Sequence, residues 1–163
     1  MLTHETTVNG TSQKPMKNNS LSIPLNILLA DDDLDDRNFF EKALSELPVA
    51  ATLSTVKNGE QLMEYLMENA DQLPDVLFLD LSMPRKTGFE CLAEIKENEK
   101  LNNLTVIMFT TSFTRGAELE ENLKSTLIKM GAADYIRKPG DFNELKMVIQ
   151  QTLDYIITKK DKH

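Results

Sequence analysis

The sequence predicts an α/β fold, a doubly wound five-stranded parallel sheet with helices on both faces. From residue 26 onward, short apolar runs alternate five times with segments whose apolar residues recur at helical spacing. Such alternation is typical of a parallel sheet, because each connection between parallel strands crosses one face of the sheet, usually as a helix. The 163 residues are 40% hydrophobic and 27% charged, which suits a single compact domain.

The strands are expected where apolar residues follow one another without a polar break, a pattern typical of strands that are buried on both faces. The second strand is the weakest, because Ser54 and Thr55 interrupt its apolar run. In chain order the expected strands span 27–30, 51–56, 76–79, 106–109 and 135–136.

A helix is expected after each strand. Pro48 ends the first, and the Asn58-Gly59 turn begins the second. Gly131 suits the position just past the fourth helix, and Asp141 with Glu144 has capping-box spacing at the start of the fifth. In chain order the apolar faces hold Phe40, Ala43, Leu44 and Leu47; Leu62, Met63 and Leu66; Phe89, Leu92 and Ile95; Leu119, Leu123, Leu127 and Met130; and Phe142, Leu145, Val148, Ile149, Leu153 and Ile156.

The domain organisation is expected to be a flexible N-terminal tail over 1–24, one domain over 25–160, and no output domain. The tail is rich in Thr, Asn, Ser, Gln and Lys and has too few large apolar side chains to offset the entropy of ordering it. A docking arm is the alternative for this segment. After Lys138 there is room for only one helix and a few residues.

Composition excludes several classes of function. A net charge of −8 argues against sequence-independent binding to nucleic acid or to an anionic membrane. The lone Cys91 excludes an intrachain disulfide and a cysteine-based zinc site, and His4 and His163, near the two ends, leave no histidine triad in the body of the chain. Because the sequence shows no secretory signal and no 18-residue apolar stretch, we expect a cytoplasmic protein.

Polar side chains follow the expected strands at the edge where parallel sheets bind ligands. Asp31, Asp32 and Asp33 follow the first strand, and Asp80 follows the third. Crowded carboxylates repel one another, and Mg²⁺ is their natural counter-ion. Thr110 and Lys138, after the fourth and fifth strands, add a hydroxyl donor and a positive charge. An aspartate there could act as a nucleophile toward a phosphoryl group.

Each of these residues also has a simpler interpretation. Asp33, Asp35 and Asp36 are best explained as a cap and first-turn acids of the first helix, where negative charge is favourable. Asp80 alone could be a turn residue, and Lys138 alone an ordinary surface lysine. The combination of residues in register, more than any one of them, favours a functional site.

Four motifs resemble the receiver domain of two-component response regulators, over about residues 25–158. The motifs are ILLADDD, DVLFLDLSMP followed by TG, VIMFTTS, and GAADYIRKPGDF. The likeness extends to single-domain regulators of the chemotaxis type and to those associated with phytochromes, through LDLSMPRKTG and FTTS. The resemblance implies a flavodoxin-like (βα)5 fold with strand order 2-1-3-4-5.

The resemblance also implies a role for individual residues. Asp80 corresponds to the phosphoacceptor and Lys138 to the family's active-site lysine, and Thr110 and Tyr135 to the switch pair. The peptide bond before Pro139 would be cis. Mg²⁺ would be held by Asp31, Asp32, Asp80 and the backbone carbonyl of Ser82.

The implied function is signalling. A sensor histidine kinase or a histidine phosphotransfer protein would donate the phosphoryl group, and phosphorylation would switch binding to an unknown downstream protein. The chain would act as a phosphoacceptor domain, catalysing no more than its own phosphorylation and slow dephosphorylation. The segment 112–131 is about six residues longer than in typical receivers, on the face that in the family usually carries the output signal. A homodimer through the last two helices is a further option.

Three other functions compete with this one. A phosphatase of the haloacid dehalogenase type would need Asp31-x-Asp33 or Asp33-x-Asp35 as its motif and would leave LDLSMP unexplained. A flavodoxin-like FMN carrier would need a phosphate-binding loop where this chain has DDDLDD, which would repel phosphate. The last alternative is a receiver fold that takes no phosphate and serves only for docking.

Overall fold

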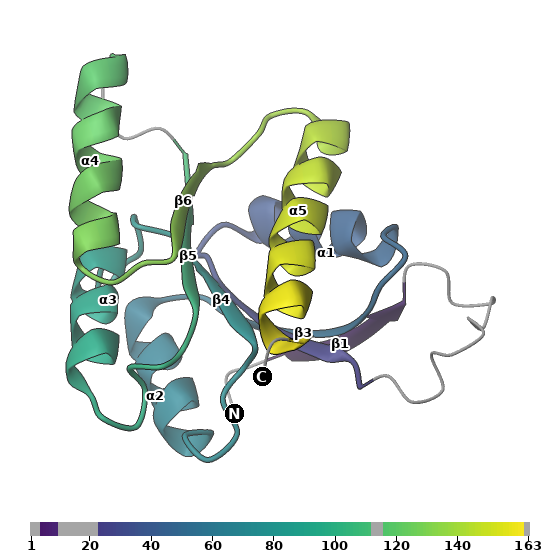
Figure 1. Ribbon diagram of the computed structural model, residues 1–163, viewed down its shortest axis with the longest axis horizontal. Helices are drawn as coiled ribbons and strands as arrows, with labels where there is room; N and C mark the ends of the chain where they lie inside the picture. The colour runs from purple at the N-terminus through teal and green to yellow at the C-terminus, as the bar shows by residue number, and fades with distance from the viewer. Residues whose placement is uncertain (1–3, 10–22, 112–115, 162–163) are drawn as a thin grey trace.

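A six-stranded sheet crosses the molecule, with α1 and α5 on one face and α2, α3 and α4 on the other (Figure 1). The computed structural model describes residues 4–9, 23–111 and 116–161. Its strands are β1 (His4–Asn9), β2 (Leu25–Ala30), β3 (Ala50–Val56), β4 (Val76–Leu79), β5 (Val106–Thr110) and β6 (Asp134–Arg137). Its helices are α1 (Leu34–Ser45), α2 (Gly59–Glu68), α3 (Gly88–Glu97), α4 (Ala117–Lys129) and α5 (Phe142–Asp161).

Five of the strands are parallel and lie in the order β3-β2-β4-β5-β6. Counted from β2, this is the 2-1-3-4-5 order, so the predicted fold class is confirmed. Because β4 and β5 lie inside the sheet with helices over both faces, every residue of these two strands is buried. This explains why their sequences are continuous apolar runs.

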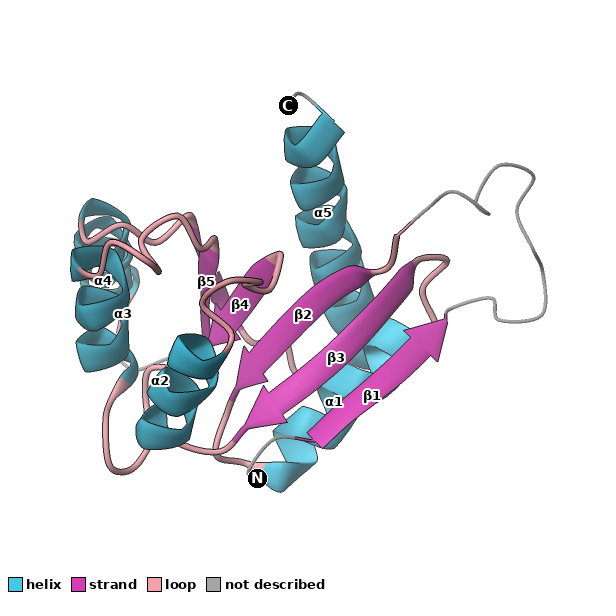
Figure 2. Cartoon of the chain, turned by 90° about the horizontal axis from the view of Figure 1, so that it is seen from below, coloured by secondary structure: helices cyan, strands magenta, loops and turns pink. Residues whose placement is uncertain are grey.

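The N-terminal segment differs from the prediction of a tail over 1–24. The chain from His4 to Asn9 forms β1, which pairs antiparallel with β3, with His4 opposite Thr55 and Asn9 opposite Ala50 (Figure 2). The sheet therefore has six strands, one more than predicted. Strand addition satisfies the backbone groups of an open sheet edge and needs few large apolar side chains, so a prediction from apolar content alone misses it. The rest of the expected tail up to residue 22 lies outside the described residues.

Two packed layers form the core. Between the sheet and α1 and α5, the rings of Phe40, Phe78 and Phe109 meet edge to face, with centroids 5.0 to 5.8 Å apart. The opposite layer packs α2, α3 and α4 through side chains such as Leu62 and Leu92. The sheet between these layers is held in one position, which fixes the ends of its strands.

Helix α4 departs from its expected core face at its first turn. Leu127 is buried, but Leu119 is 53% exposed. Figure 1 shows the reason, since the start of α4 extends past the carboxyl ends of the strands, where there is no sheet to cover it. Of the long segment 112–131, residues 112–115 lie outside the described part. None of the helices in the described ranges is both long and apolar enough to span a membrane.

Candidate functional site

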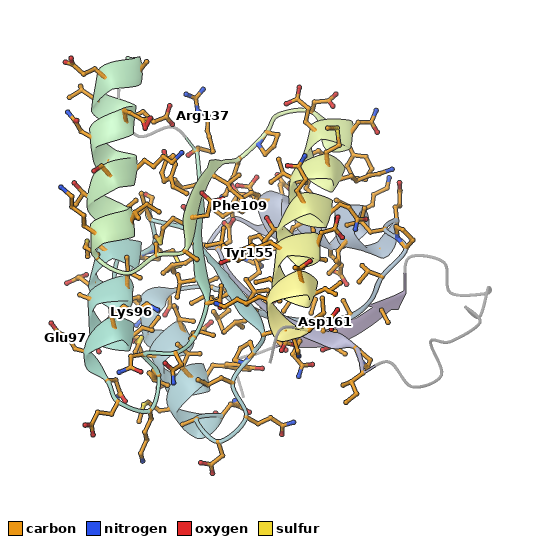
Figure 3. All side chains as sticks on the ribbon, in the orientation of Figure 1. Lys96, Glu97, Phe109, Arg137, Tyr155 and Asp161 are labelled. Carbon is orange, nitrogen blue, oxygen red and sulfur yellow. The ribbon has the colours of Figure 1, made fainter. Side chains whose placement is uncertain are left out.

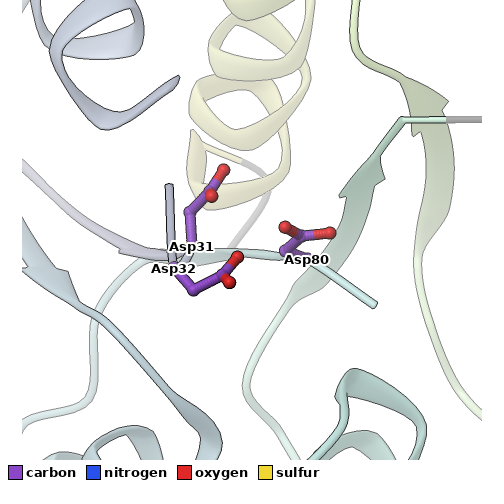
Figure 4. A group of neighbouring side chains, drawn as sticks. All are labelled: Asp31, Asp32 and Asp80. Atoms are coloured by element: carbon purple, nitrogen blue, oxygen red, sulfur yellow. The ribbon is translucent and has the colours of Figure 1, made fainter. Parts of the chain in front are cut away.

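Three carboxylates meet at the carboxyl ends of two neighbouring strands. Asp31 and Asp32 follow β2 and Asp80 follows β4, and β2 pairs with β4 up to Ala30 and Leu79 (Figure 4). One carboxylate oxygen from each of the three aspartates lies within 4.8 Å of the others. Asp31 and Asp80 are buried and Asp32 is exposed, so the group is open to solvent at Asp32. An oxygen-only donor set of this kind suits a hard divalent cation such as Mg²⁺ or Mn²⁺.

Backbone hydrogen bonds continue the sheet by one residue and so fix the two buried aspartates. The Asp31 amide donates to the Val56 carbonyl at 3.1 Å, and the Asp80 amide donates to the Ala30 carbonyl at 3.0 Å. The Asp31 side chain is held further by the Asp33 amide, which donates to its Oδ1 at 3.0 Å. Both carboxylates are therefore positioned by the strands rather than by flexible loops.

Asp33 serves as the N-cap of α1, as predicted. Its carboxylate accepts a hydrogen bond from the Asp36 amide at 3.0 Å. The phosphatase interpretation required Asp33 as half of a reactive pair, but this side chain is engaged in capping the helix.

Lys138 connects the two buried carboxylates. It follows β6, and its amide donates to the Thr110 carbonyl at 2.8 Å. Its ammonium Nζ lies 2.6 Å from Oδ2 of Asp31, 2.9 Å from Oδ2 of Asp36 and 3.3 Å from Oδ2 of Asp80. The lysine thus faces the aspartate expected to accept phosphate, together with two other carboxylates.

Burial and charge act in opposite directions on this cluster. Burial raises the pKa of Asp31 from its ordinary 3.8 to about 6, although the contact with Lys138 opposes the rise. Burial alone would lower the pKa of Lys138, but its contact with Asp31 and the charges of Asp31 and Asp80 outweigh burial and hold the pKa above its ordinary value. The lysine therefore stays positive, while the pKa of Asp31 lies above that of an exposed aspartate.

Asp80 also accepts hydrogen bonds on its other oxygen. Thr110, the buried last residue of β5, donates from Oγ1 to Oδ1 of Asp80 at 2.7 Å. The Ser82 amide approaches the same oxygen at 3.3 Å. The structure thus brings together the aspartates, the lysine and the threonine that the sequence suggested for one site.

The loop that follows Asp80 packs closely against the starts of α2 and α3. A Cβ atom on Gly88 would lie 2.3 Å from the Asp80 carbonyl oxygen, and one on Gly59 would lie 2.1 Å from the Lys86 carbonyl oxygen. Neither position has room for a side chain. The Gly88 amide also donates to the Leu81 carbonyl at 2.9 Å, which closes the loop on itself.

Tyr135, the expected aromatic switch, is tied to α4. Its hydroxyl donates to Oε2 of Glu120 at 2.9 Å, and Arg137 pairs with the same carboxylate. Figure 3 shows Arg137 beside the upper part of α4. Burial is the main cause that raises the pKa of Tyr135 to about 12, and the contact with Glu120 adds to the rise. Tyr135 is therefore both a buried core side chain and a polar link to α4.

Sequence reasoning missed two participants and mistook one backbone feature. Asp36 was interpreted only as a first-turn acid, and no motif singled out Glu120. The described residues contain no cis peptide bond, so the bond between Lys138 and Pro139 is trans. The two isomers of such a bond differ by only about 0.5–1 kcal/mol before tertiary contacts act, so the dipeptide alone does not fix the isomer.

The fold and the site together define a receiver-type domain, a parallel sheet with an acidic group, a hydroxyl and a lysine at its carboxyl edge. The family model of the response regulator receiver domain matches residues 27–150. The chain belongs to this family.

Several curated proteins are similar to this chain in sequence. The response regulator Rcp1 of Synechocystis is 32% identical over 93 residues, which cover 55% of this chain and 63% of Rcp1. The probable methanogenesis regulatory protein FilR2 of Methanothrix harundinacea is 27% identical, over 81% of this chain and 83% of its own. The sensor histidine kinase CheAY of Helicobacter pylori is 28% identical over 91% of this chain, which spans only 17% of that protein.

Solved structures of response regulators also superimpose on this chain. The phosphorylated cyanobacterial phytochrome response regulator RcpA superimposes with a TM-score of 0.71 at 27% identity, covering 84% of this chain and 96% of RcpA. The Mn²⁺-bound form of Rcp1 gives a TM-score of 0.66 at 26% identity, covering 78% of this chain and 91% of Rcp1.

Proposed function

We propose that this receiver domain accepts a phosphoryl group on Asp80 from a phosphohistidine of a sensor histidine kinase or of a histidine phosphotransfer protein. A carboxylate oxygen of Asp80 forms a bond to phosphorus as the phosphorus–nitrogen bond of the donor breaks. The electron pair stays with the histidine nitrogen, and Asp80 becomes an acyl phosphate. Because His4 and His163 are the chain's only histidines and lie near its ends, the donor is expected to be another protein.

The observation that carries this proposal is the environment of Asp80. Its buried carboxylate has a hydroxyl donor at 2.7 Å and an ammonium at 3.3 Å, with two further carboxylates close by. An acceptor of this kind needs positive charge and hydrogen-bond donors where the phosphoryl oxygens will lie. Thr110 and Lys138 supply them from the ends of two other strands.

We infer that Mg²⁺ is the cation of the site. Asp31, Asp32 and Asp80 would hold it, together with the backbone carbonyl of Ser82. When bound, it offsets the repulsion between these carboxylates and the incoming phosphoryl oxygens. The solved structure of a similar regulator, Rcp1, in its Mn²⁺-bound form supports a divalent cation in this family.

Phosphorylation is proposed to alter binding to a downstream protein through Thr110 and Tyr135. A shift of Thr110 toward a phosphoryl oxygen would change the space beside β6, where Tyr135 links to α4. A few kcal/mol of difference in binding is enough for such a switch. We expect the chain to act in the cytoplasm, with slow dephosphorylation as its only other reaction. Homodimerisation through α4 and α5 is one way to transmit the change.

Intact-mass spectrometry after incubation with acetyl phosphate tests the proposal. The wild-type chain, Asp80→Asn and Asp71→Asn are compared with and without Mg²⁺; Asp71 is an exposed acid in the loop between α2 and β4. We expect one phosphoryl group on the wild type and on Asp71→Asn, only with Mg²⁺, and none on Asp80→Asn.

Two other results would contradict the assignment. A folded wild-type chain that takes no phosphoryl group would favour a receiver that serves only for docking. An adduct that survives in Asp80→Asn would point to another aspartate, first of all in the segment 31–33.

A further inference from the structure

Asp36 is a third carboxylate on the active-site lysine. It lies in the first turn of α1, outside the group of Asp31, Asp32 and Asp80 that could hold a cation. Its Oδ2 is 2.9 Å from Nζ of Lys138. An acid that served only the helix dipole would have no need of this contact.

The first turn of α1 holds Asp36 in this position from two sides. Its amide donates to the Asp33 carboxylate, which caps the helix. The neighbouring Arg37 donates from its guanidinium to the Asp31 carbonyl at 2.8 Å, which ties the same turn to the end of β2. The Asp36 side chain is 40% exposed, so its pairing with Lys138 is partly screened by solvent.

The ammonium of Lys138 has three hydrogens to donate. The three carboxylates take all of them, and the two shorter contacts, 2.6 and 2.9 Å, go to Asp31 and Asp36. The contact with Asp80 is the longest, at 3.3 Å. A phosphoryl group on Asp80 requires the lysine to turn toward it, and each competing carboxylate opposes that movement and offsets part of the lysine's charge.

We propose that Asp36 is a positioning residue that holds Lys138 back from Asp80 and so slows phosphorylation. This inference rests on the proposed function of Asp80. Asp36 lies outside the group of aspartates that could hold the cation, and in this proposal it acts through its contact with Lys138.

The test compares Asp36→Asn with Asp35→Asn. Both changes remove one negative charge from the first turn of α1, but Asp35 is exposed and Asp36 is the one paired with Lys138. Phosphorylation by acetyl phosphate is followed by intact-mass spectrometry at saturating Mg²⁺. Asp36→Asn is expected to react roughly threefold to fivefold faster than wild type, the range for a partly exposed ion pair. Asp35→Asn is expected to stay within about twofold of wild type, as for an acid without a specific partner.

A second measurement does not depend on reaction rate. Beryllofluoride, an analogue of the phosphoryl group, is titrated onto each variant with Mg²⁺ and followed by NMR. Asp36→Asn and Asp36→Ala are both expected to bind it more tightly than wild type, and Asp35→Asn is expected to bind it as wild type does.

Three outcomes would overturn the inference. Equal acceleration by Asp35→Asn and Asp36→Asn would mean that total charge, and not position, sets the rate. Unchanged or slower phosphorylation of Asp36→Asn, on a wild type that does take the phosphoryl group, would overturn this inference and leave the proposed function intact. A wild type that is not phosphorylated would contradict both.

Discussion

At Asp31, burial disfavours the charged form of a carboxylate whose charge the proposed cation site needs. Its carboxylate is 1% exposed and lies 2.6 Å from Lys138, yet burial still raises its pKa to about 6. A carboxylate buried for structural reasons alone would be a cost to the fold. In the proposed site, a cation shared with the neighbouring Asp32 and Asp80 would offset that cost.

We expect the affinity for Mg²⁺ to depend on pH through Asp31. The folded pKa lies above the ordinary 3.8, so below about pH 6 a proton competes with the cation for this carboxylate. The association constant should fall by up to about tenfold for each unit below pH 6 and level off above it. Stability without metal has the opposite sign, because the contribution of Asp31 to folding becomes less favourable as pH rises from about 4 to about 6.

Isothermal titration calorimetry with Mg²⁺ at pH 5, 6, 7 and 8 provides the measurement. The control is Asp71→Asn, which lacks an acid outside the site and should show the same pH profile as wild type. An affinity that is the same at pH 5 and pH 7 would show that Asp31 is ionised throughout, or that it is not a ligand.

At the scale of elements, β1 is the strand that sequence patterns did not predict. It covers the edge of β3, and β3 lies between it and β2, which leads into the candidate site. An uncovered edge strand exposes unpaired amides and carbonyls to other chains. β1 therefore protects the sheet without taking part in the chemistry.

Deleting residues 1–22 tests whether β1 stabilises the sheet without affecting the candidate site. We expect the free energy of unfolding to fall by roughly 1–2 kcal/mol, because several backbone hydrogen bonds are lost against some gain in chain entropy. Amide exchange in β3 should quicken, while the phosphorylation rate of Asp80 stays the same. A chain that lacks only residues 1–3 serves as the control. Unchanged exchange in β3 would mean that β1 is not paired there in solution.

At the scale of the whole molecule, one aromatic cluster joins the sheet to α1. Phe78 lies on the central strand β4 and contacts the rings of both Phe40 and Phe109, which also contact each other. Since β4 leads directly into Asp80, this packing fixes the strand that presents the proposed acceptor. Figure 3 shows Phe109 inside the molecule, between α4 and α5.

Phe78→Ala is expected to lower the free energy of unfolding by about 3–5 kcal/mol, because it removes a fully buried ring and leaves a cavity. Phe39→Ala is the matched control, since Phe39 is partly exposed and contacts only Phe142 among the rings of the described residues. Its loss should be less than half as large. Chemical denaturation with urea measures both, and equal losses would show that the cluster is not the centre of the core.

Much of this molecule could be predicted from its sequence, for identifiable reasons. The alternation of apolar runs and helical spacing is a direct consequence of burying a parallel sheet, so the five parallel strands and their helices followed from it. The site residues stood at strand ends, where the topology leaves little freedom. Asp36 and Glu120 could not be predicted, because each is one of several similar acids in a helical turn. Only the folded structure shows which of these acids pairs with a lysine or arginine side chain.

The tight loop after Asp80 limits where this protein can vary. Gly59 and Gly88 take no part in the proposed chemistry, yet neither leaves room for even a methyl group beside the loop. The side chains of Ser82 and Arg85 are exposed, although the positive φ of Arg85 (71°) favours replacements such as Gly, Asn or Asp there. In a library of random substitutions selected for abundance alone, the two glycines would therefore be retained while those loop side chains diversified. Invariance around Asp80 would then reflect the path of the backbone as much as the transfer of phosphate.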